Sequence, residues 1–248
     1  MTIENLLIIY KRMHKYHIEE AAKFGSLGRF SLSLLSQHLT HRYSACSDGT
    51  FIHVAAKHNR LDMVPSSLMT MKNLAQRDAL GRSAFHLAGL AGNIRQCPAS
   101  LLTPAMIGLR DNLNETVAHA CVHGDCHGDL PINSLLAVAD NLSALGTTIF
   151  HDAATLDRID RFPDCLLSPK ALTNNGGIGK SPFDILGDKG LQANLAMRVI
   201  FRLTLEAPEV VRSAADRDPL LKPMFESAVE HIEKRRRLQA VIAAMTCP

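Results

Sequence analysis

The chain has 248 residues, of which 46% are apolar and only 5% aromatic, with no tryptophan. Its 27 basic and 24 acidic residues leave a formal net charge of +3, a mild bias toward acidic partners. The scarcity of aromatic side chains removes the usual stacking platforms for single-stranded nucleic acid. Because the sequence has neither a long apolar membrane span nor the basic head and apolar core of a secretory signal, we expect a soluble, cytoplasmic protein.

The first expected elements are a helix at residues 3–15 and a degenerate first repeat at residues 17–47. Residues 19–27 align with residues 53–61 at an offset of 34, and this offset is the only sign of the first repeat. We therefore expect a leading helix over residues 1–16 that caps the array.

A short pattern then recurs along the chain: a hydroxyl residue, two mostly apolar residues and a histidine, with aspartate replacing the histidine in the last copy. The ligand-type residues of this pattern are 33, 33, 32 and 33 residues apart and stand at His53, His86, His119, His151 and Asp184. A fixed period of this length is typical of stacked copies of one supersecondary structure, none of which buries its apolar face alone.

Two further columns keep the same phase. Five residues before each ligand-type residue stand turn-tolerant types, able to take a left-handed backbone: Asp48, Gly81, Asn114, Gly146 and Gly179. Twelve residues after the histidine stand Pro65, Pro98, Pro131 and Pro163, which predict the first turn of a second helix. Each repeat is therefore expected to be a turn, a short helix, a loop and a second helix.

These residues resemble the ankyrin repeat, whose core reads Thr-Pro-Leu-His-x-Ala, although only Pro182 fills the proline position of that core. The resemblance implies an all-α fold, an ankyrin-repeat solenoid of about six helix-turn-helix repeats with helical N- and C-terminal caps. Its expected divisions are a leading helix at 1–16, repeats at 17–47, 48–77, 78–110, 111–142, 143–175 and 176–190 (partial), and a helical cap at 191–248.

The repeated histidine is expected to be structural. Equivalent atoms in stacked repeats lie about 10 Å apart, which is too far to share one metal ion. The resemblance implies that each ring bonds the hydroxyl column and the neighbouring backbone. Residues 174–181 end like a phosphate-binding loop but lack its first glycine, and no Gly-x-Ser-x-Gly elbow occurs. We expect no enzyme activity, no cofactor and no metal.

The resemblance implies a protein partner bound on the concave face, at the turn tips and the end of each first helix. An effector or inhibitor that blocks its target is one such role, and it would place the protein in a host cell cytosol. Four aliphatic residues stand six positions before the ligand-type residue, where polar side chains are usual, and suggest either an interface or packing between turns. The expected partner-binding residues are Leu80, Arg82, Leu90, Leu113, Glu115, His123, Leu145, Thr147, Leu156, Ile178 and Lys180.

Three alternatives remain at this point. His123, Cys126 and His127 on an exposed loop suggest metal-dependent chemistry, and the basic run at residues 234–237 suggests nucleic-acid binding. The C-terminal helix has apolar residues on one side before this run and on the other side after it, at Leu238, Val241, Ile242 and Met245. Either the helix breaks near the run, or it offers a second apolar face for a homodimer or a partner. The six cysteines show no disulfide framework and suit a reducing compartment.

Overall fold

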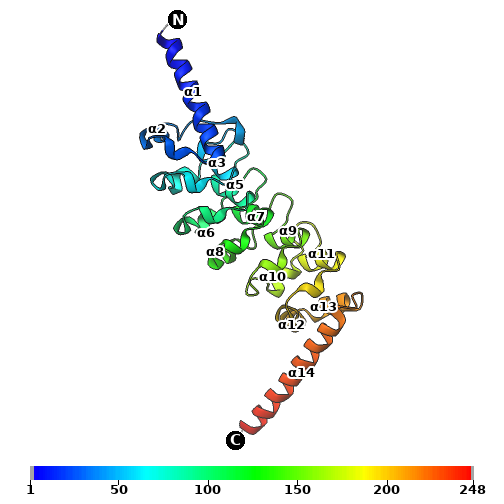
Figure 1. Cartoon of the computed structure of the whole chain (residues 1–248). Helices are drawn as coiled ribbons and strands as arrows, with labels where there is room; N and C mark the ends of the chain where they lie inside the picture. Colours follow the sequence, from blue (N-terminus) through cyan, green and yellow to red (C-terminus); the bar gives the residue numbers. More distant parts are fainter. Residues whose placement is uncertain (1–2, 247–248) are drawn as a thin grey trace. The chain divides into compact units, whose positions relative to one another are not determined.

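The computed structural model describes the backbone of residues 3–246 and the side chains of residues 13–240 (Figure 1). Within that part of the chain every regular element is an α-helix or a short 3-10 helix, and the only strand-like pairs are two isolated bridges, Tyr43–Gly49 and Arg110–Thr116. The expected all-α class is confirmed. None of the described helices combines the length and apolar character needed to cross a membrane. The chain divides into two compact units, Met1–Ile149 and Phe150–Pro248, called here the N-terminal and C-terminal units.

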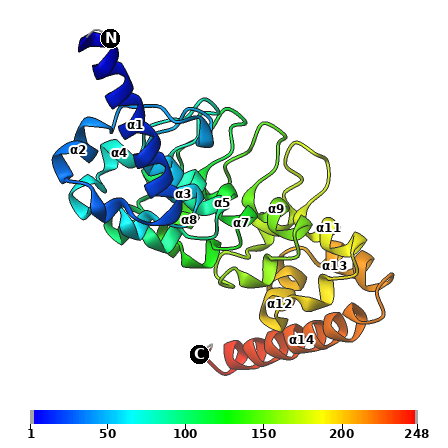
Figure 2. The ribbon, with the colours of Figure 1, turned by 45° about the horizontal axis from the view of Figure 1, so that its top comes forward.

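In the N-terminal unit the first helices of successive repeats pack against one another in order, α1 on α3, α3 on α5 and α5 on α7. The second helices lie beside this row, where α6 packs on α8, and all but α8 are shorter than the first helices (Figure 2). The helices are α1 (Ile3–Phe24), α2 (Leu32–Gln37), α3 (Phe51–Lys57), α4 (Met71–Leu74), α5 (Ala84–Leu90), α6 (Pro104–Ile107), α7 (Val117–His123) and α8 (Ile132–Val138).

Helix α1 is longer than expected. It continues past residue 15 to Phe24, because no helix-breaking residue occurs before Gly25, which takes a left-handed backbone at φ 75°. Ile18, Ala21 and Ala22 in this continuation are buried. The end of α1 therefore packs against α3 in the way that α3 packs against α5.

The repeated hydroxyl and ligand-type residues determine where each first helix begins. In α3, α5 and α7 the hydroxyl residue is the N-cap and the histidine is the third helical residue, and together they close a capping box; Ser181 and Asp184 do the same in α11. Such a cap satisfies backbone amides that a short helix otherwise leaves without partners.

The expected left-handed turn column is confirmed, since all five residues have φ between 58° and 79°. A second left-handed column follows each first helix, where glycine alternates with Asn and Asp, the other residue types that tolerate this backbone. Its members are Asn59, Gly92, Asp125, Asp157 and Gly190.

The proline column does not begin the second helices as predicted. Pro65 and Pro98 take extended ψ values of 133° and 125° and precede a single 3-10 turn, and the α-helix starts only at Met71 or Pro104. Pro131 directly precedes α8, but as an extended N-cap with ψ 130°. Proline fixes φ alone, so it is equally compatible with an extended residue before a turn.

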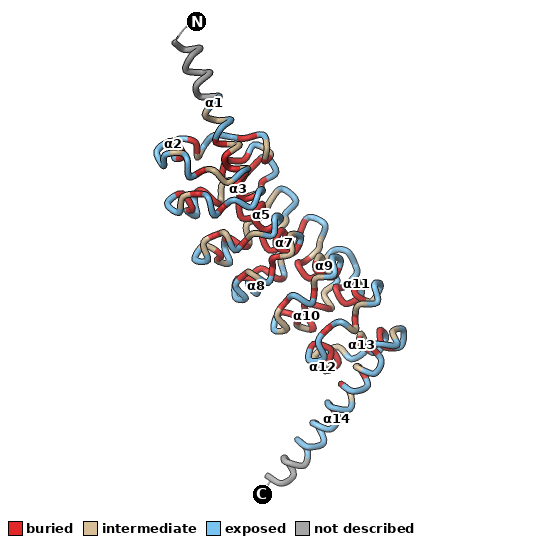
Figure 3. Tube along the Cα trace, in the orientation of Figure 1, coloured by how far each residue is buried: buried red, intermediate tan, exposed pale blue. Residues whose placement is uncertain are grey.

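The C-terminal unit contains α9 (Ile149–Thr155), which begins at the division between the units, α10 (Pro169–Thr173), α11 (Pro182–Asp188), α12 (Met197–Glu206), α13 (Pro208–Ala215) and α14 (Leu221–Thr246). Helix α10 packs on α11 and α12, and α12, α13 and α14 pack on one another. Helix α14 is continuous through residues 234–237, so the expected alternative of a break there is wrong. Its buried residues end at Ile232, and every described residue from Glu233 to Ala240 is exposed (Figure 3).

Candidate partner-binding surface

Each repeated histidine joins one repeat to the turn of the next. The backbone N–H of Thr50 donates to Nδ1 of His53 over 3.0 Å, so the ring carries its proton on Nε2. That Nε2 donates to the carbonyl oxygens of Gln76 and Arg82, at 2.9 and 3.2 Å. Burial is the main reason that the pKa of His53 lies below its usual value, which keeps the ring neutral.

In each of the four repeats that carry the histidine, a carbonyl that accepts this bond belongs to an expected partner-binding residue. Equivalent bonds join His86 to Glu115 at 3.3 Å, His119 to Thr147 at 3.3 Å and His151 to Lys180 at 3.1 Å. The structural role expected for the histidines is therefore observed, and the same bonds hold the backbone of the turn that carries the candidate surface.

The turn tips are held by a side chain two residues before the aliphatic residue. Asp78 Oδ1 accepts from the backbone N–H groups of Leu80 and Arg82, at 2.9 and 2.8 Å. Asp111 does the same for Leu113 and Glu115, and Ser143 Oγ accepts from Leu145 and Thr147. These are Asx- and Ser-type turns, which fix the backbone at the tip.

Neighbouring tips also bond one another through their backbones. Asn112 N donates to Leu80 O over 3.0 Å, and Ala144 N donates to Leu113 O over 2.8 Å. The row of tips is thus a hydrogen-bonded ladder, in which the aliphatic residues themselves supply the acceptors.

A pair of arginines, missed from the sequence, strengthens this ladder. Arg77 Nη1 donates to Gly81 O at 2.9 Å and also bonds Arg110 O, and Arg110 Nη1 donates to Asn114 O and Leu142 O, at 3.2 and 2.9 Å. The two arginines are one repeat apart, and each stands nine residues before a histidine. The repeat period alone could therefore have identified them as a pair with a shared role.

The aliphatic side chains at the tips are exposed despite this rigid backbone. Leu80, Leu113 and Leu145 of the N-terminal unit are 48, 62 and 76% exposed. Ile178 of the C-terminal unit is exposed as well. A leucine that stiffened the array by packing between turns would be buried, so this observation favours an interface over packing.

The polar members of the expected set are partly used within the chain. Arg82 Nη2 bonds Asp78 Oδ2 at 2.8 Å, and Asp78 is itself buried. Thr147 Oγ1 bonds Ser143 Oγ at 2.8 Å, and Glu115 is half-buried. Lys180 pairs with Asp188 at 2.7 Å on the exposed surface. These polar side chains help to hold the turns, whereas the exposed aliphatic side chains at the tips are accessible to a partner.

The remaining expected residues lie at the ends of first helices. Leu90 is the last residue of α5, His123 the last of α7, and Leu156 directly follows α9; all three are exposed.

Close to Leu90 and His123, the backbones of α5 and α7 approach so tightly that a Cβ on Gly124 would lie 1.8 Å from Gly89 O. Glycine is required here because no side chain fits between the two helices.

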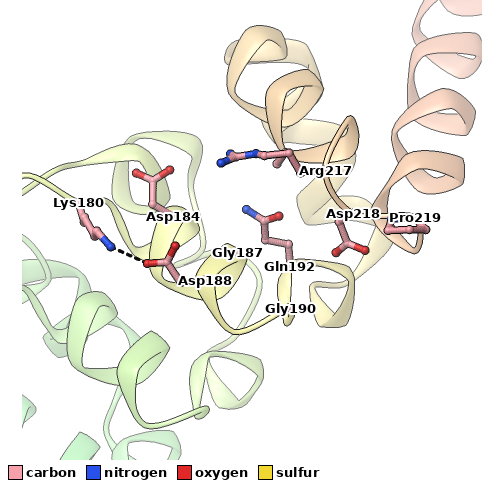
Figure 4. A pocket seen from close by; sticks show the side chains of 10 residues that line it. Lys180, Asp184, Gly187, Asp188, Gly190, Gln192, Arg217, Asp218 and Pro219 are labelled. Carbon is pink, nitrogen blue, oxygen red and sulfur yellow. Dashed lines mark hydrogen bonds and ion pairs between the residues drawn. The ribbon is translucent and has the colours of Figure 1, made fainter.

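Lys180 also lies at a cavity of about 460 Å³ in the C-terminal unit (Figure 4). Three of its charged side chains have partners nearby: Lys180 pairs with Asp188, and Asp184 Oδ2 accepts from Ser181 Oγ at 2.7 Å. Gln192 Nε2 donates to Phe183 O at 3.1 Å. No serine, cysteine or histidine is among the described residues that line the cavity.

The loop expected to be exposed at His123, Cys126 and His127 is mostly buried. Cys126 is buried and its thiol donates to Gly89 O at 3.3 Å, and His127 is fully buried. His127 stands eight residues after His119, at the repeat position filled elsewhere by the buried residues Leu61, Ile94 and Ile159. Across the described residues, no three His, Cys, Asp or Glu side chains are grouped so as to hold a metal ion.

The other sequence alternatives concern α14 and the cysteines. Residues 234–237 are exposed on α14, and Arg237 pairs with Glu233 at 3.5 Å. Leu238 is exposed, whereas the side chains of Val241, Ile242 and Met245 lie outside the described residues. Four cysteines are free and buried, Cys165 is free and exposed, and Cys247 lies outside the described residues.

The sequence was also compared with known proteins. It matches no protein-family model, and no curated protein is significantly similar to it.

Proposed function

We propose that the chain is a non-catalytic ankyrin-type repeat protein, a solenoid of about six repeats that binds one protein partner through its turn tips. The observation that supports this most is that the aliphatic side chains at the turn tips are exposed, while the backbone of the same tips is held by hydrogen bonds from the histidines, from side chains within the turn and from the neighbouring tips. A preorganised surface loses little conformational entropy on binding, and exposed apolar patches are the usual centres of protein interfaces.

The proposed contact is made of Leu80, Leu113 and Leu145, with Leu90 at the end of α5 adding apolar area. Arg82, Glu115, Thr147 and His123 form its polar rim, and Leu156, Ile178 and Lys180 are the equivalent positions of the C-terminal unit. Such a surface suits an effector or inhibitor, which acts by covering part of its target and needs no chemistry of its own.

The test replaces the three tip leucines with glutamate in one variant, Leu80→Glu, Leu113→Glu and Leu145→Glu. The control variant carries Met71→Glu, Ile132→Glu and Leu136→Glu, at side chains on the second helices that are 47, 45 and 53% exposed. Both variants add three carboxylates to exposed apolar positions, so they differ mainly in location.

Proteins that co-purify with the tagged wild-type chain from its native cells are identified by mass spectrometry and compared with those of each variant. We expect the tip variant to lose one specific protein that the control variant retains, while both keep the circular-dichroism melting curve of the wild type. A partner retained by the tip variant contradicts the proposal, and a large drop in its melting temperature assigns the leucines to packing.

A further inference from the structure

Helices α12 and α14 of the C-terminal unit leave an apolar groove of about 480 Å³ between them. Its apolar lining consists of Met197 and Phe201 on α12 and Ala228 on α14. The Phe201 ring packs edge-on against His231, with 5.8 Å between ring centroids. Met197 is 45% exposed, so the groove presents an apolar surface that no other described element of the C-terminal unit covers.

The two charged side chains that line this groove, Arg198 and Arg235, are both basic. Arg198, His231 and Arg235 line it beside Ser227, and no aspartate or glutamate does. Arg198 shares its charge with Asp164 through an ion pair. Arg235 forms no ion pair with another residue of the described chain, so its guanidinium is available to an incoming carboxylate. An apolar floor with a basic rim is complementary to an acidic, amphipathic ligand.

The shape of the groove favours a helix as that ligand. Two packed helices leave a furrow into which the ridge of a third helix fits, the usual geometry of helix-in-groove recognition. Helix α14 continues as a helix beyond Arg235, and Leu238 on this continuation is 60% exposed. A bound helix therefore has an apolar contact past the end of the groove. A second copy of the chain suits the groove less well, because pairing two such grooves would bring two basic rims together.

We propose that the groove between α12 and α14 docks an acidic amphipathic helix of a partner protein. Apolar side chains of this helix contact Met197, Phe201 and Leu238, and its carboxylates contact Arg235 and Arg198. The inference does not depend on the proposed function of the turn tips, because it uses other residues in the other compact unit.

The test uses the full-length protein and a fluorescein-labelled helical peptide of about 15 residues, long enough to span the groove. The peptide carries Leu and Phe at positions i, i+3, i+4 and i+7 and Glu elsewhere, and binding is followed by fluorescence anisotropy. The decisive pair of variants is Arg235→Glu and Arg236→Glu. The two arginines are neighbours on one exposed helical segment and undergo the same charge change, but only Arg235 lines the groove.

We expect Arg235→Glu to weaken peptide binding about tenfold or more, and Arg236→Glu to change it by about twofold or less. A second pair tests the apolar floor: Met197→Glu should also weaken binding about tenfold, whereas Leu205→Glu, on the exposed surface of α12 outside the groove, should not. A peptide with Lys in place of Glu should bind more weakly to the wild-type chain.

Several outcomes overturn the proposal. Equal losses from Arg235→Glu and Arg236→Glu would show diffuse attraction to the basic run, as expected for nucleic acid. Absence of binding by the acidic peptide, or equal binding by the lysine peptide, would remove the charge complementarity. A dimer seen by sedimentation that dissociates in Arg235→Glu would identify a second copy of the chain as the occupant.

Discussion

Nε2 of His86 donates a hydrogen bond to the carbonyl oxygen of Glu115, 3.3 Å away and 29 residues further along the chain. The other ring nitrogen accepts the backbone N–H of Ser83 at 3.1 Å. One buried imidazole therefore caps its own helix and anchors the turn of the next repeat. The repeat of this bond in both compact units makes the histidines the connection between the core and the candidate surface.

Replacement of this histidine, His86→Ala, should lower the free energy of unfolding by about 3 kcal/mol, because the Ser83 amide and the Glu115 carbonyl lose a buried partner and a cavity forms. Urea unfolding followed by circular dichroism measures the change. The control is His123→Ala at the exposed end of α7, expected to cost about 0.5 kcal/mol or less. Similar losses from both substitutions would contradict the anchoring role of His86.

Stability should fall as the pH is lowered from about 6.5 toward 4. Burial lowers the pKa of His86 to about 4 and also lowers the pKa values of His53 and His151. In the unfolded chain these rings titrate near 6.5, so between the two values the unfolded state binds protons that the folded state does not. The stabilisation is complete above about pH 6.5 and is lost as the pH falls through the folded value.

For His86 alone this loss amounts to about 3 kcal/mol. Urea unfolding between about pH 7 and pH 4 measures it, and His86→Gln should remove the part of the dependence that His86 contributes, because glutamine does not titrate. A free energy of unfolding that stays constant over this range would be incompatible with neutral, buried imidazoles.

The contact between α5 and α7 should not tolerate a methyl group. Gly124→Ala places a Cβ 1.8 Å from the carbonyl oxygen of Gly89, a backbone atom that moves only if the helices separate. We expect a loss of about 3 kcal/mol in the free energy of unfolding, or failure to fold. Gly28→Ala is the matched control, since no atom lies within 4 Å of the added Cβ. A fully stable Gly124→Ala protein would show that these backbones are further apart than described.

Alanine substitutions at two turn glycines should distinguish the cost of backbone strain from the cost of a steric clash. Gly81 and Gly179 both have φ 75°, but a Cβ on Gly81 would lie 2.2 Å from Asn112 Oδ1, whereas nothing lies within 4 Å of one on Gly179. Gly179→Ala should therefore cost about 1 kcal/mol from the left-handed backbone alone. Gly81→Ala should cost clearly more, since Asn112 must also move. Equal losses in thermal or urea unfolding would indicate that neighbouring tips are not in contact.

The period of the chain was enough to predict the local structure of the first helices. A hydroxyl residue three positions before a histidine forms a capping box because both partners lie within one helical turn, and the left-handed turn residues follow from their side chains. The bond from each histidine to the neighbouring backbone was expected from the resemblance to the ankyrin repeat, and the fixed spacing explains why it recurs in equivalent surroundings.

The period misled where one residue type is compatible with two conformations. The prolines restrict φ but not ψ, so extended N-caps before 3-10 turns and first helical turns look alike in sequence. The chemistry of His127 suggests a surface ligand as one alternative, although its phase with Leu61 and Ile94 indicates a buried position.

What the sequence determined by itself is the repeat: an all-helical chain whose first helices are capped by a hydroxyl residue and a histidine or, once, an aspartate, because capping and turn preferences act within a few residues. Only the tertiary structure decided which side chains face solvent. Three features depend on how separate helices pack: the exposure of Leu80, Leu113 and Leu145, the close approach of α5 and α7 at Gly124, and the basic-rimmed groove between α12 and α14. Packing brings together residues that no local pattern relates.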